Sequence, residues 1–294
     1  MLCFALKASC SYEEGQPYRK YQNSKYMTKI ISVAMQKGGV GKTTTAVNLS
    51  AGLAQLGYQV LAIDLDPQGN LTQHVGHDPE RISPTIYDVL KAELEGQPCD
   101  IHSCIVKTGE DFFLIPSQPE LSLVELSLMN TLSREKILAT ILEEVNGDYD
   151  FIIIDCSPSL NLLVINALTA ADSIIIPIQS EYLAARGASM ILSTIETIRQ
   201  RRLNPDLAIE GLLLTMADTR TNLARDVLAA VEYQFGPEQY IFPNIVRRSI
   251  RFAESAVAGQ SILAYDPKNP GAEAYRQLAK EIAANSKQGD GVYG

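Results

Sequence analysis

The sequence of 294 residues contains no tryptophan, only three histidines and only five cysteines. The cysteines are Cys3, Cys10, Cys99, Cys104 and Cys156. Their number is odd and none of them forms a Cys-x-x-Cys pair, so the sequence predicts neither a zinc site nor a disulfide framework. This use of cysteine is typical of the reducing cytoplasm, where we expect the protein to act.

Long apolar runs are also missing. None approaches the roughly 18 residues of a membrane-spanning helix, and the segment before Lys7 is too short for the core of a signal peptide. The 25 basic and 34 acidic residues give a formal net charge of −9. The protein as a whole is therefore not expected to attract nucleic acid or an anionic membrane, and any such contact must use a local basic patch.

The residues that are present alternate between apolar, β-branched runs and helical stretches from Thr28 onward. This pattern predicts an α/β fold, a single doubly wound and mostly parallel sheet with helices on both faces. The expected strands are 30–34, 59–64, 112–115, 150–155, 173–178 and 207–214. The expected helices are 42–54, 120–145, 161–170, 182–200, 222–235 and 272–284. In such a fold, ligands bind at the carboxyl ends of the strands.

The two ends of the sequence differ from this pattern. Residues 1–26 are polar and aperiodic for most of their length, and we expect a loose extension translated from an upstream start. The alternative is a functional tail. The folded domain is expected to cover residues 27–286, with a polar tail at 287–294.

A glycine-rich loop lies between the first expected strand and the first expected helix. It reads Lys37-Gly38-Gly39-Val40-Gly41-Lys42-Thr43-Thr44. Glycines let backbone N–H groups turn around an anion, and the helix N-terminus adds the positive end of its dipole. Lys42 would lie along the terminal phosphates, and the Thr43 hydroxyl would hold the accompanying magnesium ion. The sequence therefore predicts the phosphate loop of a nucleoside triphosphatase, since a chance glycine-rich turn would not require this strand and helix.

Two carboxylates follow expected strands and complete the predicted site. Asp155 ends an apolar strand in the Walker B manner and would hold magnesium through a water. Asp66 lies just past the strand that ends at Asp64, in a loop shaped by Pro67 and Gly69. A carboxylate there could orient the water that attacks the γ-phosphate. The alternative for Asp66 is an ordinary turn-initiating aspartate.

A second lysine, Lys37, stands at the start of the loop, where an ordinary phosphate loop does not require one. The loop thereby resembles the deviant Walker A motif, Lys-Gly-Gly-x-Gly-Lys-Thr, of the ParA/MinD group of ATPases. The resemblance implies ATP sandwiched between two copies of the chain, with Lys37 reaching the nucleotide of the other subunit. The alternative is a lysine that is merely solvated.

Further segments resemble ParA/Soj partition ATPases, in order and at plausible spacing from Thr28 to about Ala284. They are residues 64–70, 155–160, 179–182, 215–222 and 248–254. By this resemblance Asp66 is the hydrolytic aspartate of switch I, and Asp155 lies at switch II. Met216 and Asp218 lie near the adenine by the same resemblance.

One departure from the family pattern is Val246-Arg247-Arg248, where many relatives read Ile-Pro-Arg. The adenine contact that the family makes through that proline is therefore not carried over to this chain.

The resemblance implies an ATPase that uses ATP and Mg²⁺ and forms a homodimer on ATP. The dimer would bind DNA without sequence preference and hydrolyse ATP when a ParB-like or other cargo-adaptor protein stimulates it. Such a protein is cytoplasmic and nucleoid-associated, and it positions a plasmid, a chromosome region or a protein organelle.

An acidic protein can bind DNA only where its positive charge gathers on one face. Eight arginines fall within one region of the second half of the chain: Arg199, Arg201, Arg202, Arg220, Arg225, Arg247, Arg248 and Arg251. Arginine suits phosphate because its planar fork can donate two hydrogen bonds to one group. By resemblance Arg220 and Arg251 match DNA-contact stretches, and Arg247 and Arg248 would add to the patch. The alternative for each is a solvated helix charge or an ion pair with a nearby aspartate.

Two other functions use the same scaffold. A MinD-like membrane-cycling regulator of cell division ends in a helix with basic and bulky apolar residues, whereas 272–284 is alanine-rich and the last residues are polar, so no membrane contact is expected. An electron-transfer relative such as the nitrogenase iron protein needs cysteines to bridge a cluster, and Cys156 is more typical of a buried filler. His74 and His77 suggest a metal pair only weakly, because no third ligand stands nearby.

Overall fold

The computed structural model describes residues 27–180, 184–217 and 222–289. The expected extension at 1–26 and the final residues 290–294 lie outside the described residues, as do Asp218 and Arg220. All other residues of the predicted site are described.

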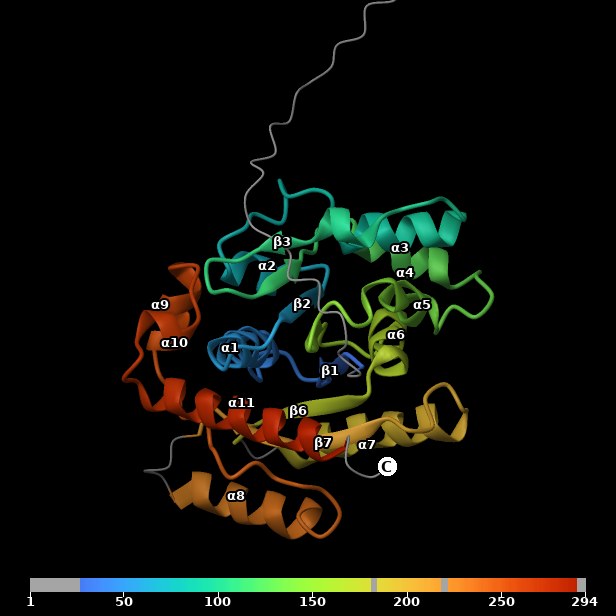
Figure 1. Cartoon of the computed structure of the whole chain (residues 1–294). Helices are drawn as coiled ribbons and strands as arrows, with labels where there is room; N and C mark the ends of the chain where they lie inside the picture. Colours follow the sequence, from blue (N-terminus) through green and yellow to red (C-terminus); the bar gives the residue numbers. More distant parts are fainter. Residues whose placement is uncertain (1–26, 181–183, 218–221, 290–294) are drawn as a thin grey trace, which may run out of the picture.

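A seven-stranded sheet in the order β3-β4-β2-β5-β1-β6-β7 forms the centre of the molecule (Figure 1). The strands are β1 (Lys29–Val33), β2 (Val60–Leu65), β3 (Val106–Lys107), β4 (Phe113–Ile115), β5 (Phe151–Cys156), β6 (Ser173–Gln179) and β7 (Ala208–Thr215). All pairs of neighbouring strands are parallel except β3 and β4. The predicted fold class is confirmed. The two-residue strand β3 was not predicted, because so short a segment shows no periodicity.

Helices cover both faces of the sheet (Figure 1). The α-helices are α1 (Lys42–Gln55), α2 (Asn70–His74), α3 (Ile86–Glu95), α4 (Leu121–Leu128), α5 (Ile137–Leu142), α6 (Leu162–Ala170), α7 (Ala184–Gln200), α8 (Asn222–Phe235), α9 (Arg251–Val257), α10 (Ile262–Tyr265) and α11 (Pro270–Gly289). The described residues also form two short 3₁₀ helices, η1 (Ile101–Cys104) and η2 (Glu143–Val145). Helices α1, α10 and α11 pack on one face, and α3 to α7 pack on the other. Among the described residues, no helix combines the length and the apolarity needed to cross a bilayer.

The strands β2 and β5 are apolar up to the aspartate near the end of each, because both of their faces are buried. In β5, Ile152 and Ile154 contribute to the core beneath α6 and α7, whereas Phe151 and Ile153 contribute to the core beneath α1 and α11. Every residue of β5 and of β2 is buried. A strand placed between two helical layers reads as a continuous apolar run rather than as an alternating one.

The helix that follows the phosphate loop, α1, is fixed to the core by polar contacts as well as by packing. The side chain of Asn48 donates to the carbonyl of Thr44 at 2.7 Å and accepts from the backbone N–H of Ile262 at 2.8 Å. The buried hydroxyls of Thr45 and Tyr275 lie 3.1 Å apart, which links α1 to α11. These contacts hold the N-terminus of α1 in a defined place.

The single long helix expected at 120–145 is wrong, because the structure divides this stretch into α4, α5 and η2. Between α4 and α5 the chain turns, with Ser133 at a φ of 54° and Leu132 exposed. Asn166 of α6 holds the turn: its side chain donates to the carbonyl of Arg134 at 2.8 Å and accepts from the N–H of Leu138 at 3.1 Å. The break therefore depends on a contact with a residue distant in sequence.

The last helix is longer than the expected 272–284, because α11 runs from Pro270 to Gly289. Its polar final turns remain helical, and the ammonium of Lys287 lies 5.6 Å from the ring centre of Tyr58. Polar residues on the exposed side of a packed helix do not end it.

Asn166→Ala should lower the free energy of unfolding by about 2 kcal/mol, because it leaves the buried N–H of Leu138 without a partner. Urea denaturation followed by circular dichroism measures the change. Asn130→Ala, at an exposed position of the same segment, is the matched control and should change stability by less than about 0.5 kcal/mol. Equal stability of the two variants would contradict the role given to Asn166.

Candidate functional site

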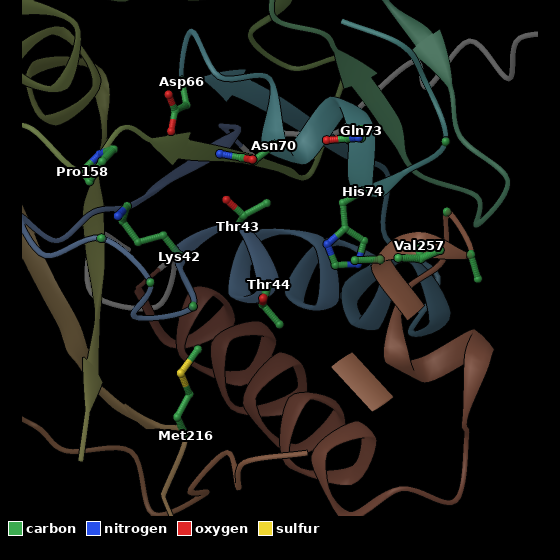
Figure 2. A pocket seen from close by; sticks show the side chains of 17 residues that line it. Lys42, Thr43, Thr44, Asp66, Asn70, Gln73, His74, Pro158, Met216 and Val257 are labelled. Carbon is green, nitrogen blue, oxygen red and sulfur yellow. The ribbon is translucent and has the colours of Figure 1, made fainter. Parts of the chain in front are cut away.

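A cavity of about 710 Å³ lies at the carboxyl end of the sheet (Figure 2). Its walls include residues that follow four parallel strands: the phosphate loop after β1, Asp66 after β2, Pro158 after β5 and Met216 after β7. Helix α2 and the residues after α9 close its other side. The cavity is therefore at the place where a doubly wound sheet binds its ligands.

The phosphate loop adopts a backbone conformation that requires glycine. Gly39 and Gly41 have φ values of 72° and 87°, which side-chain-bearing residues rarely adopt. Gly41 precedes the first turn of α1, and no side chain caps that turn. The Thr215 hydroxyl donates to the carbonyl of Val40 at 2.8 Å and fastens the loop to the end of β7. The backbone N–H groups in the first turn of α1 are thus held where a bound anion can accept hydrogen bonds from them.

Most of the predicted loop residues line the cavity. They are Gly38, Gly39, Gly41, Lys42, Thr43 and Thr44. Lys37 and Val40 do not line it: Val40 is buried, and the ammonium of Lys37 donates to Gln179 of the same chain at 3.3 Å.

Lys42 is a buried cation at the base of the cavity, with only 7% of its surface exposed. Its ammonium donates to the carbonyl of Lys37 at 3.3 Å. Burial lowers the pKa of Lys42, and the nearby carboxylates of Asp155 and Asp66 oppose that shift. A bound phosphate chain would supply the negative charge that best stabilises this ammonium.

Asp155 is the last residue but one of β5 and is fully buried, and among the described residues neither of its carboxylate oxygens has a hydrogen-bond partner. It is in register with Asp64 on the neighbouring strand β2. Burial raises the pKa of Asp155 and the charge of Asp64 adds to this effect, while the Thr43 hydroxyl and the Lys42 ammonium oppose it. A buried carboxylate with no hydrogen bond of good geometry is costly, and a bound cation would stabilise it.

Magnesium fits this arrangement. The described residues contain no group of three acidic, histidine or cysteine side chains placed to hold a metal. Magnesium in nucleotide sites does not need such a cage, because it takes most of its oxygens from phosphates and water. Thr43 and Asp155 would hold it beside the nucleotide, where the ion offsets phosphate charge.

Asp66 is largely buried and lines the cavity. Figure 2 shows its carboxylate directed into the cavity on the side of Lys42 and Thr43. One carboxylate oxygen accepts the N–H of Gln68 at 3.0 Å, the contact of a turn-initiating aspartate. Asp66 therefore initiates a turn and also lines the cavity with its carboxylate.

On the opposite side of the loop, Met216 lines the cavity with a φ of 53°. This conformation is uncommon outside glycine and is often found at functional sites. Asp218, the other residue expected near the adenine, lies outside the described residues. Val246 is buried and its N–H donates to the carbonyl of Leu214 at 2.9 Å, so the segment that departs from the family pattern packs beside β7.

The candidate DNA-binding arginines differ in their surroundings. Arg247 and Arg248 are exposed, and neither forms an ion pair with the described residues. Arg251 is paired with Glu254 at 2.7 Å and lies 3.6 Å from Asp266. Arg220 is outside the described part of the chain.

Sequence reasoning missed the cavity wall formed by α2 and by the end of α9. Asn70, Gln73 and His74 line it from α2, and Val257 at the end of α9 lies beside His74 (Figure 2). Gly259 lines the same wall. The ring of His74 lies 3.2 Å from the carbonyl of Gln260, and burial lowers its pKa. A five-residue helix has too little periodicity to be predicted, and Asn70 in the Asp-Pro-Gln-Gly-Asn stretch was the only signal for it in the sequence.

Comparisons with known proteins agree with this geometry. Residues 28–209 match a family model described as an AAA domain. The chain is 46% identical over 260 residues to the sporulation initiation inhibitor protein Soj of Bacillus subtilis, covering 88% of this chain and all of Soj. It is 43% identical over 255 residues to the chromosome partitioning protein ParA of Myxococcus xanthus, covering 86% of this chain and 87% of that protein.

Solved structures share the fold and hold the expected cofactors. The crystal structure of cobyrinic acid a,c-diamide synthase from Mycobacterium smegmatis with bound ADP and magnesium has a TM-score of 0.78 and 38% identity, covering 90% of this chain and 97% of that one. A second structure of that protein holds an ATP analogue and magnesium. ATP and Mg²⁺ are thus the cofactors of this site, and the chain belongs to the ParA/Soj family of partition ATPases.

Proposed function

We propose that this protein is an ATP-hydrolysing positioning machine that moves or spaces a cargo along DNA. It binds ATP and Mg²⁺, pairs with a second copy, and binds DNA without sequence preference in the cytoplasm, at the nucleoid. A ParB-like or other cargo-adaptor protein then stimulates hydrolysis, which separates the copies and releases the DNA. The cargo is a plasmid, a chromosome region or a protein organelle.

The observation that carries this proposal is the placement of three charged groups around one cavity. Lys42 supplies a buried cation for the phosphates, Asp155 supplies a carboxylate with no partner among the described residues, and Asp66 directs a carboxylate into the space above them. Asp66 would orient the attacking water and accept its proton, while Lys42 and the magnesium ion stabilise the charge on the transferred phosphoryl group.

Dimerisation follows from the place of Lys37. It stands at the start of the loop, outside the cavity, and its ammonium rests on Gln179 of its own chain. In the ATP-bound pair Lys37 would leave Gln179 and reach the phosphates held by the other copy. A lone subunit cannot make that interaction, so ATP binding and association are thermodynamically linked.

DNA binding is proposed for the surface that follows β7. Arg247 and Arg248 are exposed there without an ion pair to described residues, and Arg247 pairs with Ala217 through an isolated β-bridge. Arg220 is included by resemblance alone, since it lies outside the described residues. Arg251 shares its charge with Glu254 and Asp266, so we expect it to contribute less than Arg247 and Arg248. Pairing two copies would double the number of phosphates that the protein neutralises and make DNA binding depend on ATP.

The membrane-cycling alternative gains no support from the last helix. The bulky apolar residues of α11, among them Tyr275, Leu278 and Ile282, are buried in the core against α1. A helix that binds a bilayer must keep its apolar face accessible.

Asp66→Ala should bind ATP with nearly unchanged affinity but hydrolyse it about 100-fold more slowly, because it removes the group proposed to orient the water. Lys42→Ala should lose ATP binding. Isothermal titration and phosphate release measure both effects, and Asp206→Ala, an exposed aspartate near the start of β7, is the control. Hydrolysis at the wild-type rate by Asp66→Ala would refute the role of Asp66.

DNA binding should appear only with ATP and should weaken steeply as salt rises, with nearly one unit of log–log slope for each DNA phosphate that the protein neutralises. In an Asp66→Ala background that holds ATP, Arg247→Ala with Arg248→Ala should weaken binding to all duplexes alike, and Arg220→Ala should do the same. Lys91→Ala, which removes an exposed positive charge from α3, is the control. Fluorescence anisotropy with random duplex measures binding. If the ATP-bound protein shows no salt-sensitive binding to duplex DNA, the proposal that it moves a cargo along DNA is refuted.

A further inference from the structure

Beneath the cavity, a closed set of hydrogen bonds surrounds the backbone of Asp66. It begins at Asp64, whose carboxylate is fully buried at the end of β2. One of its oxygens accepts both the backbone N–H and the hydroxyl of Thr72, at 2.8 and 2.7 Å. The other oxygen accepts the N–H of Asp66 at 3.3 Å. Asp64 thus joins the end of β2 to both the Asp66 loop and α2.

The set closes through Ser117, in the segment after β4. The N–H of Ser117 donates to the Thr72 hydroxyl oxygen at 2.9 Å, and its own hydroxyl donates to the carbonyl of Asp66 at 2.7 Å. Thr72 and Ser117 are both fully buried, and neither lines the cavity. Neither hydroxyl touches the cavity, but Ser117 contacts the backbone of Asp66 directly and Thr72 contacts it through Asp64.

Together these contacts occupy both backbone polar groups of Asp66. Its N–H is held by Asp64, and its carbonyl accepts from Ser117 and from the N–H of Gly69 at 2.9 Å. Gly69 is itself tightly placed, since a Cβ atom there would lie 2.6 Å from Pro79. Hydrogen bonds in a dry interior are strong, and a broken one leaves a costly unpaired group. The backbone from which the Asp66 side chain projects is therefore held by the residues below it, and this limits the directions open to the carboxylate.

We propose that Thr72 and Ser117 are positioning residues for hydrolysis, which hold the Asp66 carboxylate at the angle that activates the water. The inference rests on the proposed function, because it assumes that Asp66 acts in hydrolysis. It adds that catalytic competence depends on two buried hydroxyls that never touch the nucleotide, one on α2 and one in the segment after β4.

Thr72→Val tests the proposal, because it keeps the shape of the side chain and removes its hydroxyl. We expect kcat for ATP hydrolysis to fall roughly tenfold, because a small displacement of a catalytic group slows the reaction. The dissociation constant of ATP should stay within about twofold of wild type. Thr72→Ser restores the hydroxyl and should restore kcat. Ser117→Ala should lower kcat in the same way, and it decides the question if Thr72→Val does not fold.

Thr108→Val is the matched control for the loss of a buried threonine hydroxyl. Thr108 is buried in the turn between β3 and β4, where its hydroxyl donates to the carbonyl of Phe112 at 2.8 Å. This variant should lose stability without a change in kcat. The double variant Asp66→Ala with Thr72→Val should be no slower than Asp66→Ala alone, because Thr72 acts only through Asp66.

The outcomes separate this inference from the function on which it rests. If Asp66→Ala is slow but folded Thr72→Val and Ser117→Ala both turn over at the rate of Thr108→Val, the positioning role is overturned and the role of Asp66 stands. If the double variant is clearly slower than Asp66→Ala, Thr72 acts by another route and the proposal is again overturned. If Asp66→Ala itself hydrolyses at the wild-type rate, the proposed function fails first.

Discussion

The burial of charged side chains at the ends of two neighbouring strands and at the start of α1 governs the architecture of this site. Asp155 is fully buried with no hydrogen bond from the described residues, and Asp64 lies beside it in register on the next strand. Burial raises the pKa of Asp64 to about 6, although Thr72 and the Asp66 N–H donate to it. Burial lowers the pKa of Lys42. Magnesium stabilises the charged form of the carboxylates and phosphate stabilises the charged form of the lysine, so the site favours the binding of both together.

The rest of the fold keeps these groups in place. The phosphate loop is held at both ends, by β1 in the centre of the sheet and by α1, which Asn48 and Thr45 tie to α10 and α11. Thr215 ties the middle of the loop to β7. A site that must bind several negative charges gains affinity when its donors are already oriented, because little conformational freedom is given up on binding.

The sequence was most informative where one local rule decides the structure. Strands buried on both faces read as apolar runs, and the phosphate loop needs glycine at fixed positions, so the parallel sheet, the loop and the position of Asp155 near the end of a strand could be predicted. Prediction failed where residues that are distant in the sequence determine the local structure. Asn166 breaks the stretch 120–145 into separate helices from a position on α6. Thr72 and Ser117 meet across 45 residues, and no spacing in the sequence indicates their contact.

The central claim is that ATP joins two copies of this chain through Lys37. Multi-angle light scattering on the Asp66→Ala protein, which should hold ATP without hydrolysing it, tests this claim most directly. One chain has a mass of 32.2 kDa. The account predicts twice this mass with ATP and Mg²⁺, and the mass of one chain with ADP. Adding Lys37→Ala should return the ATP-bound protein to a monomer. A monomer at micromolar concentration with saturating ATP, or a dimer that persists without Lys37, would contradict the account.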